Sequence, residues 1–420
     1  MNPASAANRV RKQAVAAKAG ASQLRNASTV EKNTALLAMA AALEKEQKAI
    51  LAANREDVAA ARAKGISTAL IDRLTLDEGR LLAAAAGLRE VAALPDPIGV
   101  TVSMSKRPNG MEVGRVRVPL GVIAMIYEAR PNVTVDAAGL CLKAGNTVIL
   151  RGGSEALCSN VALVAVMRKA LQATSLPAES IQLIEETDRA SAQALMRQTG
   201  LVDVLIPRGG RGLIRSVMEN ATVPVIHTGE GNCHIFVDES ADLAQAREII
   251  INAKCQRPGV CNALETLLVH RKLAQDFLPS LARDLQARGV ILKGCSACQA
   301  IIPWIEAATL DDWDTEYLDL ILAIKVVDGM EEAVSHIEQH GTGHSEAILT
   351  KDYAAARRFL GLVDAAAVYV NASTRFTDGQ QFGLGAEIGI STQKLHARGP
   401  MGLEELTCTK FVIYGNGHIR

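Results

Sequence analysis

Apolar residues in the first part of the chain recur at the spacing of amphipathic helices. This pattern predicts a helical region over residues 1–94. Two sequences within it, Ser28-x-x-Glu31 and Thr75-x-x-Glu78, have the spacing of capping boxes, in which the first side chain bonds to the backbone three residues later. We therefore expect a helix to begin at each of them.

After the helical region the pattern changes to two short strands. They are predicted at Thr101–Ser105 and Glu112–Val118 and are joined through Pro108-Asn109-Gly110. Asn-Gly is a strong signal for the tight turn of a β-hairpin. Because an isolated hairpin is only marginally stable in water, we predict an arm that pairs with another subunit. A further strand predicted near the end of the chain, at Lys410–Tyr414, is expected to join this assembly.

From Gly121 onward, apolar runs of strand length alternate with helical segments. The strands are predicted at Val122–Ile126, Thr147–Leu150, Ile181–Ile184, Val202–Ile206 and Val223–Ile226. The helices are predicted at Val133–Lys143, Val161–Leu171, 190–198 and 211–219. Buried strands that alternate with helices indicate a parallel, doubly wound sheet, and ligands bind at the carboxyl ends of such strands.

A second block with the same alternation begins near Ile235–Val237. Its other strands are predicted at Ala323–Val327, Ser345–Leu349 and Ala367–Asn371, and its helices at 241–253 and 272–287. The predicted fold class is therefore α/β, with two doubly wound parallel-sheet domains and a β-hairpin arm.

Composition narrows the class of protein. The chain has 420 residues, and its 45 basic residues balance its 45 acidic ones, so it has no basic footprint for nucleic acid. No apolar run approaches the ~20 residues that a membrane span needs, so we expect no membrane partner. Eight cysteines in a chain without a secretory signal indicate reduced thiols and a cytoplasmic protein.

The first 30 residues have two interpretations. They contain several basic residues and no acidic residue before Glu31, as a mitochondrial transit peptide does. They can equally form an ordinary first helix with one apolar side, made of Val10, Val15, Ala16 and Ala19. We favour the helix.

The most informative stretch is Lys254–Thr266, in which Pro258 and Gly259 break the chain just before Cys261. A cysteine on such a loop, with backbone N–H groups converging on it, can ionise readily and act as a nucleophile. A cysteine beside apolar residues is also typical of a protein core. Local pattern alone leaves both interpretations open.

Two glycine-rich loops follow predicted strands and carry a cation. They are Arg151-Gly152-Gly153-Ser154 and Arg208-Gly209-Gly210-Arg211-Gly212. The second opens a helix, where unpaired N–H groups attract phosphate. No Gly-x-Gly-x-x-Gly sequence follows a strand, so an ordinary Rossmann turn is not supported. Two such loops at neighbouring strand ends nevertheless favour a bound nucleotide.

Other motifs suggest metal or redox chemistry only weakly. Cys295-x-x-Cys298 lacks a second ligand pair at the right spacing, so we interpret it as structural and predict no metal site. His336, His340 and His344 recur at helical spacing, but Gly341 and Gly343 interrupt the helix that would align them. We expect these histidines in loops or at the surface, with His344 a candidate for contact with substrate.

Three long motifs are similar to those of a known family. They are Tyr127-Glu-Ala-Arg-Pro-Asn-Val-Thr134, Arg257-Pro-Gly-Val-Cys-Asn-Ala-Leu-Glu-Thr266 and Phe382-Gly-Leu-Gly-Ala-Glu-Ile-Gly-Ile-Ser-Thr392. In this order they resemble the aldehyde dehydrogenase superfamily, and within it most closely the family of γ-glutamyl phosphate reductases, the glutamate-5-semialdehyde dehydrogenases. The resemblance extends over nearly the whole chain.

The resemblance implies a role for several residues. Cys261 matches the catalytic thiol, and Asn132 matches the asparagine that forms the oxyanion hole with the N–H of that cysteine. Arg151, with Gly152 and Ser154 beside it, matches a lysine that reaches the adenosine ribose, and Glu316 matches the glutamate that holds the nicotinamide ribose. The loop at Arg208, Gly209 and Gly210 is similar to the segment that bears on the pyrophosphate.

Four further residues are candidates for substrate binding. Arginine pairs with carboxylates in a bidentate fashion, so Arg130 and Arg375 are candidates for the substrate carboxylate. Arg257, close in sequence to the cysteine, is a candidate for assisting the departure of phosphate. His344 is the fourth candidate, for contact with the substrate. Because a guanidinium can grip a 2′-phosphate, Arg151 favours NADPH over NADH.

The resemblance implies a reaction and its partners. The reaction is NADPH-dependent reduction of L-glutamate 5-phosphate to L-glutamate 5-semialdehyde and phosphate through a cysteine thioester. The implied protein is a homo-oligomer, a dimer or tetramer, with glutamate 5-kinase as a transient partner. One departure is informative, because Thr228 stands where hydrolytic members have a general-base glutamate, and Glu230 is nearby.

Other functions remain open at this point. Within the superfamily the alternative is a CoA-acylating or hydrolytic aldehyde dehydrogenase. Outside it, a cofactor-free cysteine acyltransferase would also use Cys261, and a nucleotide-binding scaffold would not need it. The domain division that we predict is a helical part of the cofactor domain at 1–98, the arm at 99–118, the NADP-binding domain at 119–234, the catalytic domain at 235–400 and an oligomerisation strand at 401–420.

Overall fold

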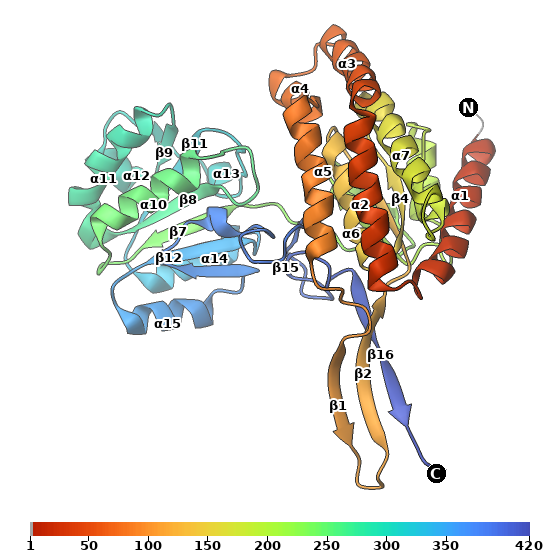
Figure 1. Ribbon diagram of the computed structural model, residues 1–420. Coiled ribbons are helices and arrows are strands. Elements are labelled where there is room, and N and C mark those ends of the chain that lie inside the picture. Colours follow the sequence, from red (N-terminus) through yellow and green to blue (C-terminus); the bar gives the residue numbers. More distant parts are fainter. Residues whose placement is uncertain (1–2) are drawn as a thin grey trace. The chain divides into compact units, whose positions relative to one another are not determined.

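The computed structural model describes residues 3–420 (Figure 1). The chain forms two compact units. Unit 1 consists of Met1–Thr228, Gly383–Gly389 and Met401–Arg420, and unit 2 of Gly229–Phe382 and Ile390–Pro400. The predicted division of the chain into five parts stays a prediction. It assigned residues 383–389 to the catalytic domain, whereas in the structure they belong to unit 1.

Unit 1 is built around a parallel sheet with the strand order β5-β4-β3-β6. Its strands are β3 (Val122–Tyr127), β4 (Thr147–Arg151), β5 (Ile181–Leu183) and β6 (Val204–Arg208). Its helices are α1 (Pro3–Leu24), α2 (Thr29–Lys45), α3 (Gln47–Ala63), α4 (Thr68–Leu74), α5 (Glu78–Ala93), α6 (Pro131–Lys143), α7 (Leu157–Gln172), α8 (Arg189–Met196) and α9 (Arg211–Asn220). The chain moves outward from β3 to β5 and then returns to the other side of β3. This reversal is a topological switch point, the usual ligand site of such sheets.

The first helix packs against this sheet, which confirms the helical interpretation of the N-terminal segment. Val10, Ala14, Ala17 and Ala21 of α1 belong to a buried cluster with residues of β3 and β6. The predicted apolar side was wrong, because Val15 is 49% exposed. Small alanines form the contact face because they let the helix approach the sheet closely.

Two other local predictions in unit 1 need correction. Thr75 does not cap α5, because its hydroxyl donates to the carbonyl of Ile71 in α4 and Asp77 is the cap instead. The predicted strand Val223–Ile226 reduces to an isolated bridge between Val225 and Leu205. Pro224 has no N–H group and cannot continue a ladder. The capping box at Ser28 and Glu31 is confirmed.

The predicted arm is a three-stranded antiparallel sheet. It contains β1 (Thr101–Lys106), β2 (Glu112–Pro119) and β16 (Thr407–Tyr414) in the order β1-β2-β16. The turn between β1 and β2 is closed by a hydrogen bond from the N–H of Gly110 to the carbonyl of Arg107. In Figure 1 the arm extends away from the β3–β6 sheet of its unit.

The predicted tail strand belongs to the arm of its own chain, and its part in oligomerisation stays a prediction. β16 pairs along its whole length with β2 of the same chain, from Thr407 opposite Pro119 to Tyr414 opposite Glu112. This pairing stabilises the hairpin within one chain and moves the outer edge of the sheet to β16.

Unit 2 contains a second parallel sheet, with the order β10-β9-β11-β8-β7-β12-β13. Its strands are β7 (Cys233–Val237), β8 (Leu264–His270), β9 (Ile291–Gly294), β10 (Glu306–Ala307), β11 (Ile321–Val327), β12 (Ser345–Leu349) and β13 (Ala367–Val370). Its helices are α10 (Leu243–Cys255), α11 (Arg271–Gln286), α12 (Ser296–Ile301), α13 (Leu310–Trp313), α14 (Met330–His340) and α15 (Tyr353–Leu362). A small antiparallel pair, β14 (Ile390–Ser391) and β15 (Gly399–Pro400), completes the unit.

The sheet of unit 2 is buried on both faces. Leu267 and Val269 of β8 belong to a core cluster with α10, α11 and α12, whereas Leu268 belongs to another with α14 and α15. Alternate side chains of one strand therefore enter two different cores, which confirms the doubly wound α/β fold. Among residues 3–420, no helix is long and apolar enough to cross a membrane.

The prediction that the histidines lie in loops or at the surface was wrong for His336 and His340, which belong to a helix. His336 and His340 lie one turn apart on α14, with ring centroids 4.5 Å apart, and His336 is buried. His344, just before β12, is completely buried. Gly341 does end the helix, but it does so after His340, so the first two histidines share one helix.

Candidate active site

The loop that carries Cys261 connects the end of α10 to the start of β8, and Cys261 itself is half-buried. Directly behind it lies Gly231. A Cβ atom added to Gly231 would come within 1.4 Å of the Cys261 carbonyl oxygen and 2.3 Å of its carbonyl carbon. Only glycine allows the two backbone segments to approach this closely.

Side chains on both sides fix the backbone of this loop. The Cys233 thiol donates to the Cys261 carbonyl at 3.2 Å. The Asn262 amide donates to the Thr377 carbonyl at 2.8 Å, and the Thr374 hydroxyl donates to the Asn262 carbonyl at 2.8 Å. The nucleophile candidate is therefore held on a rigid loop, as a site that requires exact orientation needs.

Of the predicted arginines, Arg257 lies within this loop and Arg375 contacts it from outside. The Arg375 guanidinium donates to the Asn262 side-chain oxygen and, through Nε, to Gln256 Oε1 at 3.1 Å. Burial lowers the pKa of Arg375, and the like charge of Arg257 lowers it further. The same group interacts electrostatically with Cys261, and positive charge at this position stabilises a thiolate.

Glu316 lies on the other side of Gly231, since its Oε1 accepts the Gly231 N–H at 2.8 Å. Its loop is tied to the sheet two residues later, where the Leu318 N–H donates to Glu265 Oε1 at 3.2 Å. Leu318 has a φ of 54°, a conformation that leucine rarely adopts, so the surrounding contacts must hold it.

Glu265, which holds that loop, is itself part of a buried ion pair. Its carboxylate is 2.7 Å from the ammonium of Lys254, and both side chains are fully buried. Burial raises the pKa of Glu265 to about 7. The pair joins α10 to β8, the two elements that flank the Cys261 loop.

His344 lies behind the loop. Its Nδ1 is 2.7 Å from the Ser345 hydroxyl and 3.7 Å from the Cys233 thiol, which in turn reaches Cys261. Because His344 has no exposed surface, direct contact with substrate does not fit, and we correct that prediction. His344 instead supports the residue that orients the loop.

Three of the candidate cofactor-binding residues of unit 1 lie at or just after the carboxyl end of β4: Arg151, Gly152 and Ser154. Arg151 donates to the carbonyls of Thr187 and Asp188, at 2.6 and 3.2 Å. Its buried Nε has no hydrogen-bond partner in the described residues. Gly152 follows, where a Cβ atom would come within 2.2 Å of the Asn160 amide, and then Ser154 in a short 3-10 turn. An unpaired buried donor is suited to an anionic ligand.

The Arg208 loop lies at the switch point, between β3 and β6. The buried Arg208 Nε also has no partner among the described residues. The Gly210 N–H, at the start of α9, donates to the Glu128 carboxylate at 3.0 Å. The N–H group at the start of this helix is therefore already paired with a carboxylate. Gly209 packs against the same Glu128 side chain.

Asn132 and Arg130 lie at the start of α6 in the same unit. Asn132 is exposed and donates to Asp136 Oδ2 at 3.3 Å. Burial raises the pKa of Asp136 to about 6. Arg130 precedes the first turn of α6, where its carbonyl accepts the Val133 N–H.

The candidates thus form two groups. Unit 1 contains Asn132, Arg130 and the two cationic loops, and unit 2 brings together Cys261, Arg257, Arg375 and Glu316. Sequence reasoning missed Gly231 and Cys233. The Gly229-Glu-Gly231 run was a visible signal, but only the fold shows which backbone approaches the glycine.

In the part of the chain that the structure describes, no three or more histidine, cysteine, aspartate or glutamate side chains come together as potential metal ligands. Cys295 and Cys298 are close, with sulfurs 3.6 Å apart. The Cys298 thiol donates to Ile324 and the Cys295 sulfur accepts from Val326, both in the adjacent β11.

Comparison with known proteins agrees with this architecture. The model of the aldehyde dehydrogenase family matches residues 2–291. The chain belongs to this family, which implies the use of a nicotinamide cofactor.

Individual relatives narrow the class. The chain is 66% identical to a γ-glutamyl phosphate reductase of Moorella thermoacetica, over 93% of this chain and 94% of that protein. A crystal structure of γ-glutamyl phosphate reductase from Thermotoga maritima is 53% identical, with a TM-score of 0.96 over 98% of this chain and 99% of that one. The enzyme of Saccharomyces cerevisiae is 29% identical, with a TM-score of 0.54 over 97% and 98%. The family resemblance seen in the sequence motifs is confirmed.

Proposed function

We propose that this chain reduces L-glutamate 5-phosphate with NADPH to L-glutamate 5-semialdehyde and phosphate, the second step of proline biosynthesis. The assignment of γ-glutamyl phosphate as the compound that is reduced rests on the high sequence identity to γ-glutamyl phosphate reductases over nearly the whole chain. The observation that carries the chemistry is the Cys261 loop, held rigidly by Gly231 and Cys233 and flanked by Arg375.

The reaction begins at the thiolate of Cys261. Its sulfur attacks the acyl carbon of the acyl phosphate, the carbon–oxygen bond to phosphate breaks, and a thioester remains. Arg257, within the loop, is suited to neutralise the departing phosphate. A nicotinamide cofactor, when bound, would supply a hydride to the thioester carbon. The resulting thiohemiacetal oxyanion re-forms a carbonyl, the carbon–sulfur bond breaks and the thiolate is regenerated.

Both tetrahedral stages carry a negative oxygen that needs donors placed in advance. The Cys261 N–H and the Asn132 amide are our proposed donors. Asn132 is exposed at the start of α6 and has a second amide hydrogen beyond the one directed at Asp136. Loss of one such donor typically costs about 10²–10³ in rate.

The cofactor residues fit an anionic dinucleotide. The buried Nε atoms of Arg151 and Arg208 have no partner in the described residues, and Gly152 and Gly209 leave no room for a side chain. Arg151, Gly152 and Ser154 would hold the adenosine ribose and its 2′-phosphate, and the 208–210 loop the pyrophosphate. Glu316 would hold the nicotinamide ribose, and the carboxylate of Glu128 would have to yield its contact with Gly210 to the pyrophosphate.

Arg151→Ala should weaken the binding of NADPH much more than that of NADH. The guanidinium would pair with the 2′-phosphate that only NADPH carries, and a charged hydrogen bond is worth about 1.5–3 kcal/mol, so the NADPH Kd should rise by about 10- to 100-fold. Fluorescence titration of both cofactors measures this. Arg189→Ala, at the first position of α8 in the same unit, is the matched control. An equal loss of affinity for both cofactors would show that Arg151 does not bind the 2′-phosphate.

Phosphate dependence tests the proposed reaction itself. Thr228, at the position of the hydrolytic base, is buried and cannot take a proton from water as a carboxylate does. An absent general base slows thioester hydrolysis by about 10²–10⁴. Oxidation of L-glutamate 5-semialdehyde should therefore require phosphate, with arsenate able to replace it.

The measurement is NADPH formation with and without phosphate, for the parent and Glu230→Gln. The observation that favours a hydrolytic aldehyde dehydrogenase is the carboxylate of Glu230, two residues from the position of the general base. Its backbone carbonyl accepts the Thr342 hydroxyl at 2.6 Å, which holds the segment next to Gly231. Fast turnover without phosphate that disappears in Glu230→Gln would establish hydrolysis instead.

We further propose a cytoplasmic homo-oligomer, a dimer or tetramer, that interacts transiently with glutamate 5-kinase. The arm sheet supports self-assembly, because large apolar side chains are exposed on both of its outer strands: Val102, Met104, Phe411, Ile413 and Tyr414. Exposed apolar patches on such strands usually mark an interface. Light scattering at micromolar concentration should give at least the mass of a dimer, and a monomeric mass would contradict the proposal.

A further inference from the structure

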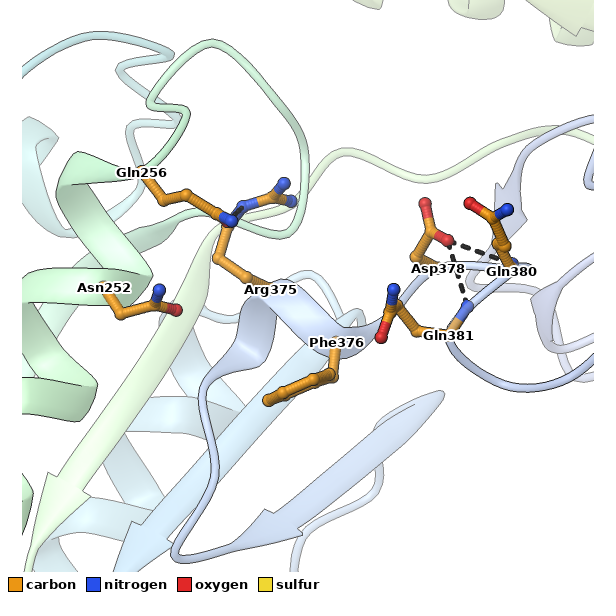
Figure 2. Close-up of a pocket in the computed structure, with 7 residues that line it drawn as sticks. All are labelled: Asn252, Gln256, Arg375, Phe376, Asp378, Gln380 and Gln381. Atoms are coloured by element: carbon orange, nitrogen blue, oxygen red, sulfur yellow. Dashed lines mark hydrogen bonds between the residues drawn. The ribbon is translucent and has the colours of Figure 1, made fainter.

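Unit 2 contains a polar pocket of about 260 Å³ beside the Cys261 loop (Figure 2). It is lined by Asn252, Gln256, Arg375, Phe376, Asp378, Gln380 and Gln381. The pocket carries a guanidinium and a carboxylate from one short segment, together with amides from α10 and from the segment after Asp378.

The cationic side of the pocket is Arg375. Two of its three nitrogens are used, Nε on Gln256 and Nη1 on Asn262. The remaining nitrogen, Nη2, makes no hydrogen bond to the residues that the structure describes. The guanidinium is therefore fixed in orientation while one edge can still donate to a ligand, and a carboxylate is the group that this edge binds best.

The anionic side is Asp378. Its Oδ1 accepts the N–H groups of Gln380 and Gln381, at 2.9 and 3.2 Å, which shapes the turn. No described residue donates to its other oxygen, Oδ2. Figure 2 shows the Arg375 and Asp378 side chains on the same side of the segment that connects them, whereas Phe376 points the other way. The two charges therefore face the same space.

Amide groups complete the lining. Asn252 and Gln256 are four residues apart at the end of α10, so their side chains lie on one face of the helix. The Gln256 oxygen is taken by Arg375, and its NH₂ group makes no hydrogen bond to a described residue. Amides of this kind can bind either end of a zwitterion, because they offer both donors and acceptors.

We infer that this pocket binds the α-amino-acid end of the substrate, with the α-carboxylate on Arg375 and the α-ammonium on Asp378. The inference rests on the proposed function, which requires an amino-acid substrate with its reacting carbonyl at Cys261. It adds Asp378, Gln256 and Asn252 to the substrate site and explains how the enzyme selects an amino acid over a simple aldehyde.

The position of the pocket agrees with the reach of the substrate. Arg375 bonds to the side chain of Asn262, and Asn262 follows Cys261 directly. A glutamyl side chain is short, so a head group held at Arg375 leaves the acyl carbon near the thiol. The charge of Arg257 acts on Arg375 and adds to the positive potential there, which favours the substrate's anionic groups.

Truncated substrates test the assignment of each charge. The reaction is followed as NADPH formation with phosphate present, on L-glutamate 5-semialdehyde, on 5-oxopentanoate, which lacks the amino group, and on 4-aminobutanal, which lacks the carboxylate. Loss of one partner of a charged hydrogen bond corresponds to about a 10- to 100-fold loss in kcat/KM.

Arg375→Gln should lose kcat/KM on all three substrates through the Cys261 loop, and should lose this further factor only on L-glutamate 5-semialdehyde and 5-oxopentanoate, which carry the carboxylate. Asp378→Asn keeps the Oδ1 acceptor of the turn. Its kcat/KM should fall by the same ~10- to 100-fold factor on L-glutamate 5-semialdehyde and 4-aminobutanal but not on 5-oxopentanoate. The matched controls are Arg358→Gln, whose guanidinium pairs with Glu331 at an exposed site, and the exposed Asp276→Asn. Both controls should resemble the parent on all three substrates.

The outcomes separate this inference from the proposed function. If the parent does not oxidise L-glutamate 5-semialdehyde with phosphate, the proposed function fails. If the parent does so but each pocket variant loses the same factor on all three substrates, Arg375 and Asp378 only support the Cys261 loop and the inference is overturned. Unchanged kcat/KM in both variants overturns it as well.

Discussion

Cys261→Ser is expected to abolish reduction of the acyl phosphate while NADPH still binds. A serine hydroxyl does not ionise near neutral pH, and no base is positioned in our mechanism to activate it, so the covalent step is lost. We expect kcat to fall by at least about 10⁴-fold, since loss of a covalent nucleophile costs that much or more in other enzymes. Single-turnover assays with a fluorescence titration of NADPH measure both parts.

Cys255→Ser is the matched control. Cys255 lies at the end of α10, close in sequence, and burial raises the pKa of its thiol. This variant should retain parental activity. Normal turnover in Cys261→Ser combined with an inactive Cys255→Ser would assign the nucleophile to the other thiol.

Chemical labelling alone would not identify the nucleophile. The interaction with Cys298 lowers the pKa of Cys295, so this thiol can compete with Cys261 for iodoacetamide. Labelling experiments therefore belong in a Cys295→Ser background.

Gly231→Ala is the second change with a large expected effect. Its new methyl group would meet the carbonyl carbon and oxygen of Cys261, which are backbone atoms and cannot rotate away. The loop must move, which also disturbs the contact of Gly231 with Glu316. A displacement of about 1 Å can cost about 10² in rate, so we expect at least this loss in kcat and a lower Tm.

Gly361→Ala in α15 is the matched control in the same unit, because a Cβ atom there meets nothing within 4 Å. Alanine at a helical glycine should leave activity unchanged and raise stability by about 0.5–1 kcal/mol. Steady-state kinetics and thermal denaturation compare the two variants. Parental kcat in Gly231→Ala would show that the Cys261 loop tolerates movement.

Much of the fold was predictable because it depends on local patterns. Buried apolar runs predicted β3, β4, β6, β7 and β12 to within about two residues, since a strand covered on both faces must be apolar throughout. The two errors in unit 1 came from one residue with two possible partners and from one proline within an apolar run. Thr75 bonds back to α4 rather than forward to α5, and Pro224 interrupts an apolar run that otherwise resembles a strand.

The candidate site was predictable only for residues within distinctive motifs. Cys261 and Asn132 lie in such motifs, Glu316 was matched only through the family resemblance, and the roles of all three remain proposals. Gly231 and Cys233 carry no comparable signal, because each matters through Cys261, about 30 residues further along the chain. His344 was misassigned for the same reason, since its burial follows from the packing around the start of β12 rather than from its flanking glycines.

The sequence by itself determined the α/β class, the two doubly wound sheets, the arm hairpin and the aldehyde dehydrogenase family, because periodicity, turn residues and long motifs are local properties of a chain. The tertiary structure alone decided that β16 pairs with β2 of its own chain, that Gly231 must be glycine and that Arg375 and Asp378 line one pocket. These features depend on contacts between distant segments. Such contacts arise only when the whole unit is packed, since each segment allows many partners until the others exclude them.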